Sequence, residues 1–181
     1  MGHARSGNTY LGVALGLMYP NKKSNYRIHG AINIRILDAK YPVFTPLRNP
    51  LDCIASNVAF MQYPNQKEVT EWIDNAANHY LNFYSYLKKY EDKTNILFFE
   101  KFTKDLSYIE NSVKNIVFEE PKQITDEDVK IKMNEFDLWL SLPRNNEDQL
   151  KSHKKEIVKN DKYKMCVDIF EYFKDKYYNI Y

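Results

Sequence analysis

The sequence has little of what marks secreted, metal-binding or membrane-spanning chains. It contains two cysteines and four histidines in 181 residues. Cys53 and Cys166 lie far apart, and the histidines include no His-x3-His pair, so we predict no structural metal. The first apolar run, residues 13–18, is too short to cross a membrane. Because the chain also shows no signal-peptide pattern, we expect a reduced, cytoplasmic protein without a membrane segment.

An excess of charge of one sign is also nearly absent. The formal net charge of +2 is too small to indicate a nucleic-acid partner. The stretch from Lys151 to Lys164 is rich in lysine, which predicts either a local anion-binding surface or a solvated helix face. An apolar content of 44% and an aromatic content of 15% are typical of a globular chain. The length predicts one domain, residues 1–181.

Strand and helix patterns alternate along the chain. Residues 95–99 form an unbroken apolar run, typical of a strand buried on both faces of a parallel sheet. Residues 68–90 repeat large apolar side chains at helical spacing, which predicts a core helix. Pro50 suits the first position of a helix that follows a proline-containing strand at 41–47. We also expect helices over 8–18, 104–116, 125–140 and 161–177, a short strand at 26–29 and a loop at 141–148. This alternation predicts an α/β layered fold with a mostly parallel sheet.

The first dozen residues have the layout of an anion site. Gly2 and Gly7 bracket a loop that runs into a helix, and the first-turn N–H groups of a helix attract anions. Arg5 and two hydroxyl side chains add a positive charge and further donors. The Gly-x4-Gly spacing fits a phosphate-binding loop, but Asn8 occupies the position of the usual lysine. Almost no residues precede this loop, so we expect its leading strand to be reduced to residues 1–4, or the chain to be a shortened form of a longer one.

Three stretches, taken in order, resemble the P-loop sulfotransferases, which use 3′-phosphoadenosine 5′-phosphosulfate as donor. Residues 4–11, Ala-Arg-Ser-Gly-Asn-Thr-Tyr-Leu, look like the family's 5′-phosphosulfate loop, Pro-Lys-Ser-Gly-Thr-Thr-Trp-Leu. Residues 47–56 contain Arg-Asn-Pro-x-Asp-x-x-x-Ser, the family's 3′-phosphate motif, with Arg48 and Ser56 at its two ligand positions. Residues 96–102 resemble the family's Tyr-Glu-Asp-Leu strand end, with Phe99 in place of the tyrosine.

The resemblance implies a P-loop NTPase-like three-layer fold with a mostly parallel central sheet flanked by helices. It implies transfer of a sulfuryl group to a hydroxyl or amine acceptor, with 3′-phosphoadenosine 5′-phosphate as product and no metal. Arg5 matches the family's catalytic lysine. The donor has no β- or γ-phosphate, which accounts for Asn8 in place of a lysine. The implied donor-binding residues are Arg5, Ser6, Gly7, Asn8, Thr9, Tyr10, Arg48 and Ser56. A loose similarity to the family's C-terminal motif adds Arg144 and Lys154.

His29 is the candidate general base because it follows the predicted strand at 26–29, as the family's catalytic histidine does. An unperturbed imidazole suits proton abstraction near neutral pH. The alternative is an exposed turn histidine. In the same way, Arg48 is alternatively a surface residue capping a turn, Ser56 a helix-face serine, and the segment carrying Arg144 and Lys154 a basic loop and helix start.

Two other functions stay open at this point. A small P-loop kinase would need a lysine at position 8 and a metal-binding acid after a strand, and neither is evident. A degenerate sulfotransferase-like fold would bind an anion or a partner without turnover. For the enzyme, we expect a small-molecule, carbohydrate or peptide acceptor, and no nucleic acid or membrane partner. The sequence leaves the identity of the acceptor and the oligomeric state open.

Overall fold

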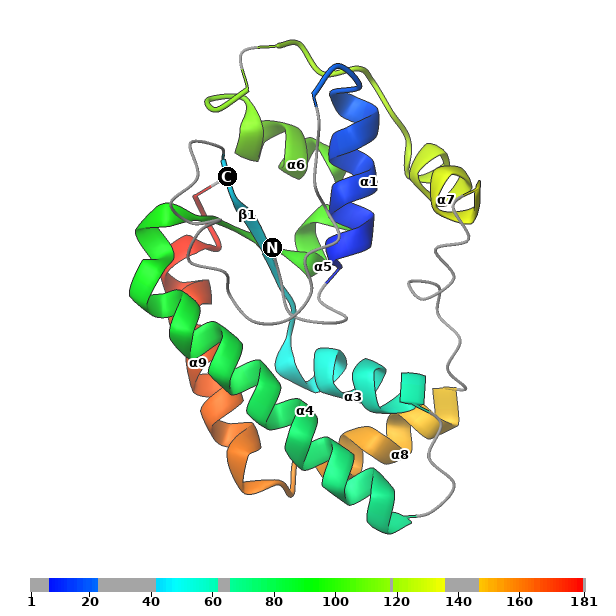
Figure 1. Cartoon of the computed structure of the whole chain (residues 1–181), viewed down its shortest axis with the longest axis vertical. Helices are drawn as coiled ribbons and strands as arrows, with labels where there is room; N and C mark the ends of the chain where they lie inside the picture. Colours follow the sequence, from blue (N-terminus) through cyan, green and yellow to red (C-terminus); the bar gives the residue numbers. More distant parts are fainter. Residues whose placement is uncertain (1–6, 23–41, 62–65, 118, 136–146, 181) are drawn as a thin grey trace.

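The computed structural model describes residues 7–22, 42–61, 66–117, 119–135 and 147–180. This part of the chain is mostly helical, with a small sheet near its centre (Figure 1). Its elements are α1 (Asn8–Met18), β1 (Phe44–Leu47), α3 (Pro50–Met61), α4 (Gln66–Leu87), the 3-10 helix η1 (Lys88–Lys93), β2 (Asn95–Phe98), α5 (Phe99–Phe102), α6 (Leu106–Val113), α7 (Asp126–Glu135), α8 (Glu147–Ile157) and α9 (Asp161–Tyr177).

The sheet of the described residues consists of β1 and β2, which run parallel. Their register pairs Phe44 with Asn95 at one end and Leu47 with Phe98 at the other. The predicted mixture of helices with a parallel pair of strands is confirmed in this coarse form. Because the two strands end at the same level, the residues that follow them come out side by side at the carboxyl edge of the sheet.

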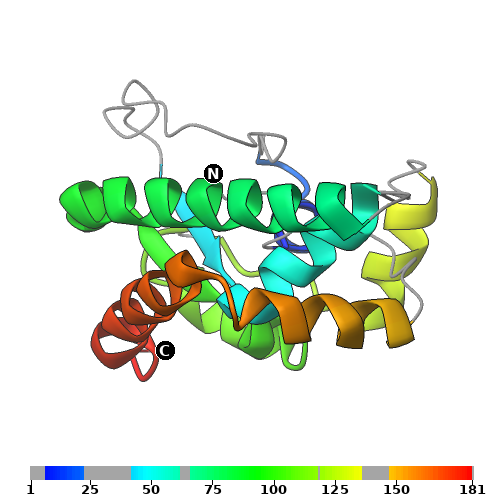
Figure 2. The same ribbon diagram turned by 90° about the horizontal axis from the view of Figure 1, so that it is seen from below.

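Helices pack against both faces of this sheet. Ile96 and Phe98 of β2 belong to a core cluster formed mainly by α3, α4, α8 and α9. Leu97, between them in sequence, belongs to a second cluster formed mainly by α1, α6 and α7. This split follows from the alternation of side chains along a strand. Figure 1 shows the two groups of helices on opposite sides of β1. Within the first group, Figure 2 shows α8 and α9 on one side of α4.

Helix α4 confirms the predicted stripe of large apolar residues. Ile73, Tyr80, Tyr84 and Leu87 are all at most 2% exposed, so the stripe is core. The helix ends at Leu87, three residues earlier than predicted, because η1 takes over there with tighter turns. One of its tyrosines also ties it to the first strand, since the Tyr84 hydroxyl donates to the backbone carbonyl of Pro46 at 2.8 Å.

The ends of other predicted elements shift by a few residues. Phe99, predicted as the last residue of a strand, begins α5 instead. The helix predicted over 104–116 is α6, whose start is fixed by the Asp105 carboxylate accepting the N–H of Ser107 at 2.9 Å. The loop predicted over 141–148 ends earlier, because α8 begins at Glu147. The predicted strand at 26–29 lies outside the described residues.

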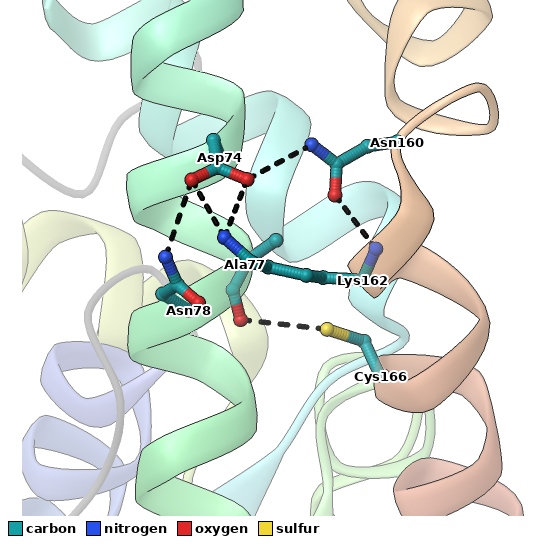
Figure 3. Close-up of polar contacts among 6 residues, drawn as sticks. All are labelled: Asp74, Ala77, Asn78, Asn160, Lys162 and Cys166. Atoms are coloured by element: carbon teal, nitrogen blue, oxygen red, sulfur yellow. Dashed lines mark hydrogen bonds and ion pairs between the residues drawn. The ribbon is translucent and has the colours of Figure 1, made fainter.

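Helices α4 and α9 are joined by a group of polar contacts (Figure 3). The Asp74 carboxylate accepts hydrogen bonds from Lys162 Nζ at 2.7 Å and from Asn160 Nδ2 at 3.4 Å. Asn160 also caps α9, because its Oδ1 accepts the N–H of Lys162 at 3.0 Å. The buried thiol of Cys166 donates to a backbone carbonyl of α4, and both cysteines are free. No helix among the described residues is both long and apolar enough to span a membrane.

Candidate anion-binding site

The residues that follow the two strands meet at the carboxyl edge of the sheet. Arg48 and Asn49 follow β1, and Phe99 and Glu100 follow β2. The backbone N–H of Asn49 donates to Oε1 of Glu100 at 2.8 Å, which joins the two segments directly. The crevice outside the carboxyl ends of parallel strands is where open α/β sheets place their ligands. We therefore expect the predicted site at this edge.

Gly7 reaches the same edge from the start of α1. It is the N-cap of that helix with a φ of 94° and a ψ of 17°, a left-handed conformation that favours glycine. A Cβ at this position would lie 2.5 Å from Cδ2 of Phe99 and 2.9 Å from Cζ of Phe102. The backbone of Gly7 thus packs directly against the Phe99 ring. This position therefore needs glycine for a steric reason as well as a conformational one.

Arg48 contacts the same aromatic ring. Its guanidinium carbon lies 4.3 Å from the centroid of the Phe99 ring, a cation–π distance. Its backbone is fixed by α4, because the hydroxyl of the fully buried Tyr80 donates to the Arg48 carbonyl at 2.8 Å. Gly7 and Arg48 are far apart in sequence and were predicted to belong to one site. Phe99 is the residue that brings them together.

The start of α3 continues this edge. Asn49 caps the helix, with its Oδ1 accepting the N–H of Leu51 at 3.0 Å and its carbonyl accepting the N–H of Cys53 at 2.9 Å. Pro50 is the first helical residue, as predicted. Ser56 lies further along α3 and is 6% exposed. The predicted 3′-phosphate motif therefore forms one continuous strand-to-helix turn with its serine on the helix.

Lys154 comes to α3 from α8. Its Nζ lies 2.5 Å from Oδ1 of Asp52, and both side chains are about two-fifths exposed (39% and 40%). Asp52 precedes Ser56 by one helical turn, so both lie on the same side of α3. The structure thus places Lys154 beside the helix that carries Ser56, in an ion pair that the sequence analysis did not foresee.

The side chain of Tyr10 points elsewhere. Its hydroxyl donates to Oδ1 of Asp126 on α7 at 2.7 Å, and its ring stacks on Phe102. Burial, and then the Asp126 carboxylate, raise the pKa of this phenol well above its usual value. The hydroxyl therefore helps to hold α1 against α7. If Tyr10 binds the donor as predicted, it does so through its backbone N–H at the start of α1 and not through its hydroxyl.

The other residues of the loop divide into two groups. Asn8 is buried and Thr9 half-buried in the first turn of α1. The first intrahelical hydrogen bond runs from Leu11 N–H to the Gly7 carbonyl at 3.0 Å, so the amides before Leu11 lie at the open end of the helix. The remaining predicted residues, Arg5, Ser6, His29 and Arg144, lie outside the described residues, and their roles stay predictions.

Sequence reasoning missed two contributors to this edge. Phe99 was taken only as a departure from the family's tyrosine, yet its ring contacts both Gly7 and Arg48. Glu100 was assigned no role, yet it fixes the backbone of Asn49. The available signal was their position directly after a buried strand, parallel to the strand that precedes Arg48. Among the described residues, no three His, Cys, Asp or Glu side chains are grouped so that they could hold a metal ion.

Comparisons of the chain with protein-family models, with curated proteins and with solved structures give no match. The likeness to sulfotransferases therefore depends on the three sequence stretches and on the arrangement of their described residues.

Proposed function

We propose that the chain is a sulfotransferase with a P-loop NTPase-like three-layer fold, using 3′-phosphoadenosine 5′-phosphosulfate as donor. The observation that carries this proposal is the meeting of Gly7 and Arg48 on the Phe99 ring, at the carboxyl ends of two parallel strands. Both residues were selected from sequence for opposite ends of one nucleotide. Helices on both faces of the two-stranded sheet support the proposed fold.

The start of α1 fits the 5′ end of such a donor. An eleven-residue helix carries a partial positive charge at its first turn, which attracts anions. The glycine at its N-cap allows the backbone to pack against the Phe99 ring, where a Cβ would collide. Arg5, just before this turn, would add the charge that stabilises negative charge developing on the donor.

Arg48 fits the 3′-phosphate. Its guanidinium lies 4.3 Å from the centroid of the Phe99 ring, and an arginine fork suits a phosphate oxyanion better than a point charge does. The Tyr80 hydroxyl fixes the Arg48 carbonyl, and Glu100 fixes the next peptide, so the arginine starts from a rigid backbone. Ser56 on α3 would add a hydroxyl, and Lys154 of α8, ion-paired with Asp52, places a second cation beside α3. This donor set suits a phosphate monoester and requires no metal.

The donor supplies a sulfuryl group attached to a phosphate leaving group. The chain's own tasks are then to neutralise charge at the α1 end and to take a proton from the acceptor. We assign the first to Arg5 and the second to a ring nitrogen of His29. The acceptor is a hydroxyl or amine on a small molecule, carbohydrate or peptide.

A thermodynamic cycle of calorimetric titrations, in which one change is made in the protein and the other in the ligand, tests the donor site. Wild type and Arg48→Ala are each titrated with 3′-phosphoadenosine 5′-phosphate and with adenosine 5′-phosphate, which lacks the 3′-phosphate. A charge-assisted hydrogen bond contributes about 1.5–3 kcal/mol, so Arg48→Ala should weaken binding of the first ligand by about 10- to 100-fold. The same substitution should change binding of the second ligand little, because the groups being removed interact with each other.

Lys155→Ala is the matched control, because it removes an exposed positive charge next to Lys154. Equal losses for both ligands with Arg48→Ala, or a comparable loss with Lys155→Ala, would remove the assigned 3′-phosphate role. Binding of ATP that requires Mg²⁺ would favour the kinase instead. Tight binding of 3′-phosphoadenosine 5′-phosphate, without transfer of labelled sulfate from the donor to phenol, sugar or amine acceptors, would favour the non-catalytic fold.

A further inference from the structure

Few side chains hold α8 against the other described elements. Within this helix, His153 and Ile157 are the buried residues, and Leu150 packs partly buried against the same core. The ion pair between Lys154 and Asp52 is about two-fifths exposed on each side (39% and 40%), and ion pairs this exposed add little stability. The position of α8 therefore depends strongly on its two buried residues, one of which is titratable.

The environment of His153 suits a neutral imidazole. The side chain is 7% exposed and hydrogen-bonds the backbone of Ala55 on α3. That bond raises the histidine's pKa, so the ring N–H is the donor. Nδ1 has no hydrogen-bond partner among the described residues, which leaves Nε2 as the bonded nitrogen. A proton on Nδ1 would place a second, unsatisfied donor and a full charge inside a helix contact.

Among the described residues, the charged groups on α8 and on the helices packed against it do not offset such a charge. From α3, Asp52 is paired with Lys154 of α8 itself. Glu156 of α8 is paired with Lys159. The carboxylates on the first half of α4 are Glu68, Glu71 and Asp74, and Asp74 is bonded to Lys162 of α9. None of them is a cause of the lowered pKa of His153, which comes from burial and is opposed by the Ala55 bond.

We propose that His153 is a positioning residue that holds α8, and Lys154 with it, against α3 only while its imidazole is neutral. Asp52, Ala55 and Ser56 lie within one turn on one side of α3, the side that α8 contacts through Asp52 and Ala55. Release of α8 would uncover this side and withdraw Lys154 from it. The consequence for nucleotide binding depends on the proposed function, whereas the helix movement does not.

The sign of the pH dependence follows from burial. Desolvation lowers the pKa of His153 below its ordinary value of about 6.5, so the released helix binds more protons than the docked one. Docking is therefore strongest above about pH 6.5 and weakens as the pH falls through that value. Between the two pKa values, the docking equilibrium should change by up to about tenfold per pH unit.

Hydrogen exchange of the ligand-free chain tests this proposal. Protection of the α8 amides, corrected for the intrinsic exchange rate, is compared with that of α4 at about pH 7.5 and about pH 5.5. In wild type, α8 should lose about three- to tenfold of its protection at the lower pH while α4 keeps its own. In His153→Gln, whose amide can still donate to Ala55 but does not titrate, α8 protection should be the same at both values.

His79→Gln is the control because His79 is an exposed histidine on α4, and it should behave as wild type. Equal α8 protection at both pH values in wild type, or the same loss in His153→Gln, would overturn the proposal. If His153→Gln does not fold, an NMR titration of the wild-type imidazole decides. A midpoint below the ordinary value of about 6.5 supports the positioning role, and one at or above it contradicts that role. No nucleotide is present, so failure here leaves the sulfotransferase proposal untouched.

Discussion

Substitution of Gly7, the N-cap of α1, by alanine should destabilise the chain. Gly7 has a φ of 94°, where an L-residue is strained by about 1–2 kcal/mol. The added Cβ would also lie 2.5 Å from Cδ2 of Phe99, and forced overpacking costs about 1–3 kcal/mol. We expect a loss of about 3 kcal/mol, which is a fall in Tm of about 6–12 °C for a chain of this size.

Urea denaturation followed by circular dichroism measures this loss as a change in midpoint at constant slope. Gly16→Ala is the matched control, because Gly16 lies inside α1 with helical backbone. There, alanine should be neutral or stabilising by up to about 1 kcal/mol. Equal stability of Gly7→Ala and wild type would show that the left-handed turn, or its contact with Phe99, is wrong.

Two further predictions concern polar contacts. Tyr10→Phe removes the 2.7 Å hydrogen bond to Asp126, so the free energy of unfolding in urea should fall by about 1–2 kcal/mol. The calorimetric affinity for 3′-phosphoadenosine 5′-phosphate should not change, because the ligand contacts only the backbone of Tyr10. A loss of affinity as large as the loss of stability would refute this prediction. Lys162 lowers the pKa of Asp74 below its usual 3.8, so this contact stabilises the fold above that pH and its contribution disappears as pH falls through the lowered pKa. Asp74→Asn should therefore cost at most about 1 kcal/mol near pH 7, because the carboxylate is partly exposed. The difference from wild type should shrink as the pH falls below 3.8, and a pH-independent difference would contradict the assignment.

Local sequence patterns predicted the elements that have strong periodicity. The buried stripe of α4, the apolar β2 and the start of α3 at Pro50 all follow from side-chain spacing and from proline's fixed φ. The need for glycine at position 7 could also be predicted, because a loop turning into a helix requires unusual backbone angles. Element ends were less predictable: Phe99 continues an apolar run in sequence, yet it begins a helix.

Contacts between distant segments could not be predicted from such patterns. The Phe99 ring joins Gly7 to Arg48 only because β1 and β2 end at the same level, which is a property of the register. The pairing of Lys154 with Asp52 depends on how α8 crosses α3, and no local signal encodes that crossing. Physical reasoning from sequence therefore identified parts of the candidate site and left its connecting side chain unrecognised.

The central claim is that the start of α1 and Arg48 bind one ligand. The most direct measurement is an NMR titration of the ¹⁵N-labelled chain with 3′-phosphoadenosine 5′-phosphate, following the amides of Thr9 and Tyr10 together with the Nε–H of Arg48. We predict that all three signals shift along one binding curve with a single Kd. Shifts at only one of the two segments, or two curves with different Kd values, would contradict a shared site.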